Sequence, residues 1–90
     1  MANNYCVYRI KFPNNKVYVG ITNNISKRMW MHKNAPKKYL INHAINKHKN
    51  KFHVDKLEHG LTKSKALKME RLYIKLYLSQ NRKFGYNLTS

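Results

Sequence analysis

The sequence has very few acidic residues and almost no cysteine. Three Asp and Glu stand against 19 Lys and Arg, which gives a formal net charge of +16 over 90 residues. Such a charge repels itself in a compact fold, so we expect a polyanionic partner that neutralises it. Nucleic acid is the first expectation, and an anionic membrane surface is the weaker alternative. Cys6 is the single cysteine, which excludes an intramolecular disulfide and a zinc finger built on cysteines.

Long hydrophobic runs are also missing. No stretch approaches the roughly eighteen apolar residues of a membrane-spanning helix, and the N-terminal MANNYCVYRI lacks the residue order of a signal peptide. We therefore expect a soluble, cytoplasmic protein without membrane contact. The length allows one domain, residues 1–90, with one modest core. A metal cluster made only of histidines is not expected, because their spacing matches no familiar zinc pattern; they are His32, His43, His48, His53 and His59.

The first part of the chain predicts a β-hairpin. Residues 5–12 alternate between apolar and basic side chains, the period of a half-buried strand. A Pro-Asn-Asn turn follows, and residues 16–22 form a second strand rich in Val, Ile and Tyr. If the turn has three residues, Tyr8 and Tyr18 fall on the same face, one diagonal step apart. Gly20 inside the second strand indicates a bulge or a close approach, so an opening beside a phenol is expected there.

The rest of the chain predicts three helices and one more strand. Asn23 or Asn24 can cap a helix that runs to about Lys33, and Pro36 breaks it. The further expected segments are a helix over residues 38–48, a strand over residues 51–60, a long helix capped by Thr62 or Ser64 and ending near Gln80, and an irregular tail. The fold class is therefore α+β: a small three-stranded antiparallel sheet flanked by helices, in the order β-β-α-α-β-α.

Glu70 lies where a carboxylate is not expected. At 100° per residue, it lies in the middle of the apolar stripe of the last helix, whose members all fall within about 60° of it: Ala66, Leu67, Tyr73, Ile74 and Tyr77. A carboxylate there costs several kcal/mol unless it is paired or binds a metal. A buried ion pair with Arg or Lys is the structural alternative. A bound divalent cation is the functional alternative. The carboxylate by itself would repel the phosphates of a polyanionic partner, and a cation held by it reverses the sign of that interaction.

Arg28 and His32 are spaced i, i+4 on the first predicted helix, so they project from one face. His32 lies within about 20° of Ile25 and Arg28 within about 60°, on the side expected to pack inward. Taken alone, an exposed pair of basic residues remains the simpler interpretation. The two other acidic residues, Asp55 and Glu58, are expected on or beside the third strand, with nothing to place them near Glu70.

Taken in order, these residues resemble the GIY-YIG nuclease family. CVYRI, with Val7 and Tyr8, and VYVGIT, with Tyr18 to Gly20, are similar to its paired motifs. The following arginine and histidine of the family match Arg28 and His32. Its metal-binding glutamate matches Glu70 in MERLYIKLY, and its late asparagine matches Asn87 in GYNLTS. Cys6 replaces the usual glycine of the first motif, and Pro36 to Tyr39 offer no histidine for the role that some relatives place there.

The resemblance implies a DNA endonuclease that hydrolyses phosphodiester bonds with one divalent cation, Mg²⁺ or Mn²⁺, at Glu70. It also implies an origin in a phage or mobile element, and hence action inside an infected host cell. Arg28 is expected to bind the scissile phosphate, while Tyr8, Tyr18 and His32 order and deprotonate the attacking water. Asn87 either orients a water or phosphate, or holds the C-terminal tail.

Two questions stay open at this point. Free tyrosine has a pKa near 10 and free histidine one near 6.5, so the sequence does not decide which of them is the general base. A non-catalytic basic module that binds DNA or RNA is the alternative function, and a small ribosome-associated protein is a third. Neither gives a reason for Glu70 in the stripe of the last helix.

Overall fold

The elements follow the order that the sequence predicts. The structure, a computed structural model, describes residues 3–34, 40–49, 51–81 and 83–87. The elements are β1 (Tyr5–Lys11), β2 (Val17–Thr22), α1 (Ile25–Asn34), α2 (Leu40–His48), β3 (His53–Leu61) and α3 (Lys63–Tyr77). The predicted break at Pro36, the helix start at Lys38 and the residues up to Tyr39 lie outside the described residues.

The three strands form one antiparallel sheet in the order β2-β1-β3, which confirms the predicted α+β class. In the β1–β2 register, Tyr8 lies opposite Gly20 and Ile10 opposite Tyr18. Tyr8 and Tyr18 are therefore diagonal neighbours on one face, as expected. β3 has two register shifts against β1, and Gly60 within it has a φ of 68°. These irregularities explain the imperfect alternation of this strand, which continues past Gly60.

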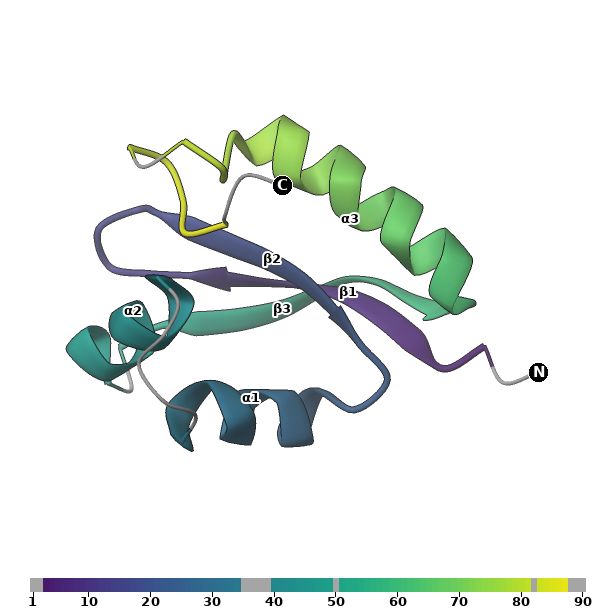
Figure 1. Ribbon diagram of the computed structural model, residues 1–90, viewed down its shortest axis with the longest axis horizontal. Coiled ribbons are helices and arrows are strands. Elements are labelled where there is room, and N and C mark those ends of the chain that lie inside the picture. Colours follow the sequence, from purple (N-terminus) through teal and green to yellow (C-terminus); the bar gives the residue numbers. More distant parts are fainter. Residues whose placement is uncertain (1–2, 35–39, 50, 82, 88–90) are drawn as a thin grey trace.

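Helices cover both faces of the sheet (Figure 1). On the face of α1 and α2, the residues Tyr8, Ile10 and Phe12 of β1 pack with Ile41, Ala44 and Ile45 of α2. On the face of α3, Val7 and Val19 pack with Ala66. The prediction of a half-buried first strand was thus wrong around Val7 and Tyr8, because α3 covers the side that the basic residues seemed to mark as exposed.

The helix ends have specific causes. The Asn24 side chain accepts a hydrogen bond from the Lys27 N–H at 3.0 Å, and Thr62 caps α3 by accepting from the Lys65 N–H. α3 ends at Tyr77, before the predicted end near Gln80, because Leu78 adopts the left-handed conformation that closes a helix. No helix within the described parts of the chain is long and apolar enough to cross a membrane.

The segment after α3 runs along the free edge of β2 (Figure 1). The Val17 N–H donates to the Phe84 carbonyl, and the Tyr86 N–H donates back to the Val17 carbonyl. Further along, the Asn87 amide replaces a peptide group: its Oδ1 accepts from the Val19 N–H at 2.9 Å and its Nδ2 donates to the Val19 carbonyl at 2.8 Å. The predicted irregular tail is therefore an ordered cover of the sheet edge through Asn87.

We expect Asn87→Ala to lower the free energy of unfolding by about 2 kcal/mol, because it leaves two buried backbone groups of Val19 without partners. Asn23→Ala is the matched control: Asn23 is exposed, and a surface change of this kind costs no more than about 0.5 kcal/mol. Urea unfolding of both variants measures the difference. Equal stabilities would show that the Asn87 amide does not hold the edge of β2.

Candidate active site

Tyr8 of β1 reaches α1 across the position of Gly20. Its ring is fully buried, and its Oη lies 2.9 Å from Nε2 of His32, which is buried as well. A Cβ added at Gly20 would lie 2.6 Å from the Tyr8 Oη, closer than real Cβ atoms approach a neighbour. The close approach expected at Gly20 is thus present, but the expected opening beside the Tyr18 phenol is not, because the Tyr8 ring fills the space over Gly20. Glycine at position 20 is what lets Tyr8 hydrogen-bond to His32.

Tyr18 completes an aromatic group with these two residues. Its ring centroid is 6.2 Å from that of Tyr8 and 5.4 Å from that of His32, which it meets edge to face. Such an edge-to-face contact aligns the positive ring edge with a negative ring face. Tyr18 is half-buried, because β2 is an edge strand. The two tyrosines and the histidine therefore form one wall, with the Tyr18 ring nearest to solvent.

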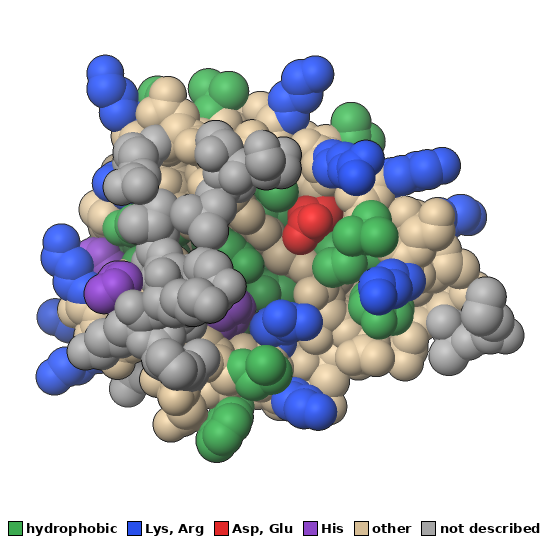
Figure 2. Space-filling model, in the orientation of Figure 1, with side chains coloured by type: hydrophobic (Ala, Val, Ile, Leu, Met, Phe, Trp, Pro, Cys, Tyr) green, Lys and Arg blue, Asp and Glu red, His purple; other side chains and the backbone are tan. Residues whose placement is uncertain are grey.

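Arg28 and Glu70 approach this wall from opposite faces of the sheet. Arg28 projects from α1 and Glu70 from α3, and both are half-buried. Their charges act on both tyrosines: Arg28 lowers and Glu70 raises the pKa of Tyr8 and of Tyr18. Figure 2 shows a small acidic patch between α3 and α1, surrounded by basic and hydrophobic side chains. The edge of β2 is thus where five of the six predicted site residues meet.

Glu70 lies inside the stripe of α3 that packs against the sheet, between Tyr77 and Ile74 around the helix. Met69, Tyr73, Ile74 and Tyr77 pack against the core around Ala66, whereas Leu67, which the sequence places in the stripe, is exposed. The stripe is therefore shifted towards Met69, and Glu70 within it is half-buried. Burial raises the pKa of its carboxyl, against the opposing effects of the Arg71 and Arg28 charges.

The ion pair that was the structural alternative for Glu70 is not formed within the described residues. There, the one salt bridge joins Arg9 to Asp55 at 2.7 Å. The other acidic residue, Glu58, accepts a hydrogen bond from the Tyr73 hydroxyl. Asp55 and Glu58 thus interact on β3, where the sequence places them, whereas the charges of Arg71 and Arg28 act on the Glu70 carboxyl without forming a salt bridge with it.

This donor set fits one kind of metal ion better than others. The described residues contain no group of three or more His, Cys, Asp or Glu that could enclose a metal, so they provide no closed zinc site. Mg²⁺ instead keeps several waters and uses one or two carboxylates together with phosphate oxygens of a substrate. A single half-buried carboxylate such as Glu70 matches that requirement.

The surroundings of Tyr8, Tyr18 and His32 set the protonation states of these three side chains. Burial, followed by the neighbouring Tyr18, raises the pKa of Tyr8, and burial followed by Glu70 raises the pKa of Tyr18. Both phenols are therefore neutral at pH 7. Burial and the Arg28 charge lower the pKa of His32 to about 4. The imidazole is neutral as well, so a ring nitrogen can accept a proton.

Asn87, the sixth predicted residue, bonds to the residue that follows Tyr18. Both atoms of its amide are engaged by the Val19 backbone, which supports the alternative that it holds the tail. Sequence reasoning missed this pairing, because a side chain that imitates a peptide group leaves no periodic signal.

Sequence reasoning also missed Lys27 and Met31, which border the site together with Arg28.

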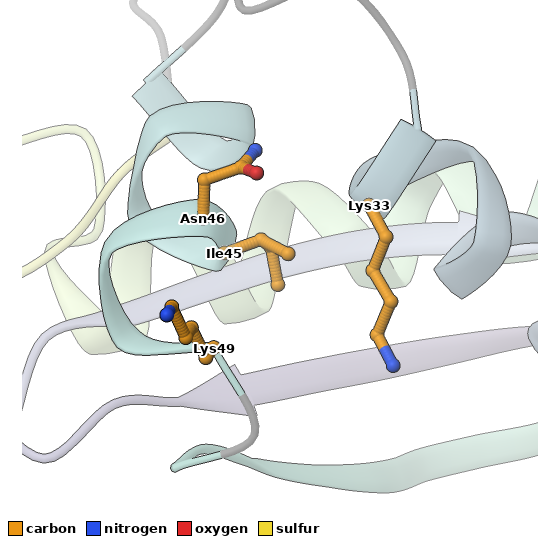
Figure 3. Close-up of a pocket in the computed structure, with 4 residues that line it drawn as sticks. All are labelled: Lys33, Ile45, Asn46 and Lys49. Atoms are coloured by element: carbon orange, nitrogen blue, oxygen red, sulfur yellow. The ribbon is translucent and has the colours of Figure 1, made fainter.

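A separate hollow, called the second hollow below, lies between α1 and α2, away from the candidate site. It has a volume of about 220 Å³ and is lined by Lys33, Ile45, Asn46 and Lys49. Figure 3 shows Lys33 extending from α1 and Lys49 lying at the end of α2, with Ile45 between the helices. Its two lysines suit contact with phosphate, and none of these four described residues is acidic.

Comparisons with known proteins show the family of the chain. The family model of the GIY-YIG catalytic domain matches residues 4–87. The chain therefore belongs to the GIY-YIG nuclease family.

Two solved structures similar to the chain come from one nuclease, the homing endonuclease I-TevI. Its catalytic domain is 30% identical, with a TM-score of 0.76, over 96% of this chain and 99% of that one. A glutamate-to-alanine mutant of the catalytic domain of this intron endonuclease is also 30% identical, with a TM-score of 0.77 over 94% and 93% of the two chains. No curated protein gives a significant match.

We expect Gly20→Ala to lower the free energy of unfolding by about 2 kcal/mol, because overpacking forces the Tyr8 ring to move. The hydrogen bond to His32 is lost with that movement. Gly60→Asn is the matched control, since nothing lies within 4 Å of an added Cβ there and asparagine tolerates a positive φ. Urea unfolding checks both variants. A Gly20→Ala protein as stable as the parent would contradict the close approach of Tyr8.

Stability should also fall as the pH is lowered through the range set by His32. Its pKa is about 4 in the folded protein and 6.5 in an unperturbed chain. Between these values the unfolded chain binds a proton that the folded protein does not, so stability falls as the pH drops from 6.5 to 4. His32→Gln should flatten the curve in this window. An NMR titration of the His32 ring with a midpoint at or above 6.5 would contradict the assignment.

Proposed function

We propose that this chain is a DNA endonuclease that hydrolyses phosphodiester bonds with a single divalent cation, Mg²⁺ or Mn²⁺, held at Glu70. The observation that carries the proposal is the meeting of an arginine, two phenols, a neutral histidine and a carboxylate that forms no ion pair with the described residues, at one edge of the sheet. Family membership supports the nuclease reaction. The homing activity named for I-TevI supports DNA as the substrate class.

Arg28 is proposed to bind the scissile phosphate. Its guanidinium is a permanent cation with several N–H donors, and it can place two of them on phosphate oxygens. Glu70 would hold the cation, whose charge neutralises the phosphate as negative charge develops in the transition state. Because Arg28 and Glu70 lie on opposite faces of the sheet edge, a phosphate between them is held from two sides.

Tyr8 and His32 are proposed to take the proton of the attacking water. The neutral His32 can accept through Nε2 the hydrogen bond that the Tyr8 hydroxyl donates. The Tyr8 oxygen then has lone pairs for a water molecule. As the water oxygen bonds to phosphorus, its proton passes to the Tyr8 oxygen while the Tyr8 proton passes to His32. The bond from phosphorus to one sugar oxygen breaks at the same time, and that leaving oxygen takes a proton from solvent. An anionic phosphate beside His32 raises its pKa, which makes this imidazole a better acceptor.

Tyr18 is proposed to order the same water and to shield it from bulk solvent. Its ring contacts both Tyr8 and His32, and its neutral hydroxyl can donate one hydrogen bond and accept another. The remaining positive charge of the chain, including Lys33 and Lys49 at the second hollow, suits the phosphate backbone away from the cleaved bond. A DNA substrate also fits the cytoplasmic location expected from the sequence.

We expect Glu70→Gln to lower the rate of plasmid cleavage with Mg²⁺ by about 10²-fold or more, since it removes the carboxylate that would hold the cation, and with it the positive charge that stabilises the transition state. The matched control is Glu58→Gln on β3, whose new amide oxygen can still accept from Tyr73. Its cleavage rate should equal that of the parent protein. If Glu70→Gln cuts supercoiled plasmid at the parent rate, the assignment of the cation to Glu70 is wrong.

Arg28→Ala separates catalysis from affinity. It should abolish cleavage while most of the DNA affinity remains, because the other basic residues still release counterions from the DNA. A filter-binding or gel-shift measurement beside the cleavage assay gives both quantities. Binding without metal-dependent cutting by the parent protein would favour the non-catalytic nucleic-acid-binding alternative.

A further inference from the structure

The outer side of α1 presents two large apolar side chains to solvent. Trp30 is 65% exposed and Met31 is 42% exposed, whereas His32, the next residue, is buried in the site. Partly buried Ile25 and Met29 anchor the inner side of the same helix. The fold therefore does not need Trp30 or Met31 for its core. A tryptophan offers more apolar surface than most side chains, and exposed apolar patches mark interaction sites.

Met31 joins this surface to the proposed cleavage site. A hollow of about 140 Å³ at the start of α1 is lined by Thr22, Asn23, Asn24, Lys27, Arg28 and Met31. Around the helix, Met31 lies about 60° from Arg28, Lys27 about 100° and Trp30 about 160° in the same direction, so Trp30 is on the far flank of the exposed side of α1. Figure 2 shows hydrophobic side chains over α1 beside basic ones, on the same face as the acidic patch.

Charge identifies the kind of partner that fits. α1 carries Lys27, Arg28 and Lys33 and has no acidic residue, in a chain of net charge +16. The partner must therefore be anionic and must also offer apolar surface to an indole. Nucleic acid does both, because its phosphates bind lysine and its bases present π-faces on which aromatic rings stack. Apolar side chains can also enter between base steps of a duplex.

We propose that DNA bound at Arg28 continues across the outer side of α1, where Met31 contacts it near the bound phosphate and Trp30 stacks against a base further along. Lys27, which lies between them on the helix surface, contacts a backbone phosphate of the same stretch. This inference rests on the proposed nuclease function and adds to it a base contact away from the cleaved bond. The contact anchors α1 on the DNA through surface that the core leaves free.

The single tryptophan of the chain gives a direct probe. In EDTA, where cleavage is prevented, the fluorescence of the parent protein is measured while a DNA duplex is added. Stacking should quench the emission. Heparin, a polyanion without bases, should bind the protein and leave the emission nearly unchanged. An equal change with heparin, no change with DNA, or a larger change with vesicles of anionic lipid would overturn the proposal.

Variants test the energetic contribution of the contact. We expect Trp30→Ala to weaken binding to the duplex about tenfold, the size of one lost stacking contact, and to leave heparin binding unchanged. Trp30→Phe, which keeps an aromatic ring, should restore most of the affinity. Leu76→Ala is the matched control: Leu76 is 71% exposed, but it lies on α3, about 120° around that helix from Glu70. Equal affinity of the Trp30→Ala and parent proteins for DNA would overturn the base contact.

Plasmid cleavage by the parent protein with Mg²⁺ distinguishes the two proposals. If the parent cuts DNA and Trp30 reports no stacking, the base contact fails alone and the nuclease function stands. If the parent binds DNA with quenching but never cuts, the nuclease function fails while the DNA contact of α1 stands. If the parent does not bind DNA at all, both proposals are wrong.

Discussion

The close approach of the Tyr8 phenol to Gly20 is the constraint on which the site depends. Only a residue without a Cβ leaves room for the Tyr8 hydroxyl to pass the neighbouring strand and reach His32, 2.9 Å away. The contact also fixes the pairing of the first two strands. A shift of one residue would turn Tyr8 toward α3, away from α1, because side chains alternate between the faces of a sheet. Register, helix position and active-site geometry are thus linked through one glycine.

The second requirement is a sheet edge that both faces can reach. β2 is an edge strand, so Arg28 from α1 and Glu70 from α3 can approach one another around it. A free edge would also invite pairing with another chain. The segment up to Asn87 covers this edge with backbone hydrogen bonds and one side-chain amide. The tail therefore stabilises the strand that carries Tyr18, while the chemistry lies with side chains on the elements around it.

Much of the fold could be predicted because its signals are local. Alternation indicated the hairpin, asparagine and threonine indicated the helix starts, and the turn length placed Tyr8 and Tyr18 on one face. The burial of both faces around Val7 could not be predicted in this way, since it depends on where α3 packs. The continuation of the third strand past Gly60 also depends on its pairing with β1.

The candidate site was predicted in outline from an energetic cost and not from local patterns. A carboxylate in an apolar stripe is costly, and this singled out Glu70. Its exact companions followed from the order of the family motifs, whereas its lack of an ion pair in the described residues emerged only from the packing. The central claim is that these residues form one metal-dependent nuclease site. Supercoiled plasmid incubated with the parent protein and Mg²⁺, with and without EDTA, tests it most directly. Nicked or linear DNA should form only in the sample without EDTA. Equal products in both samples, or none in either, would show that these residues do not form a metal-dependent nuclease site.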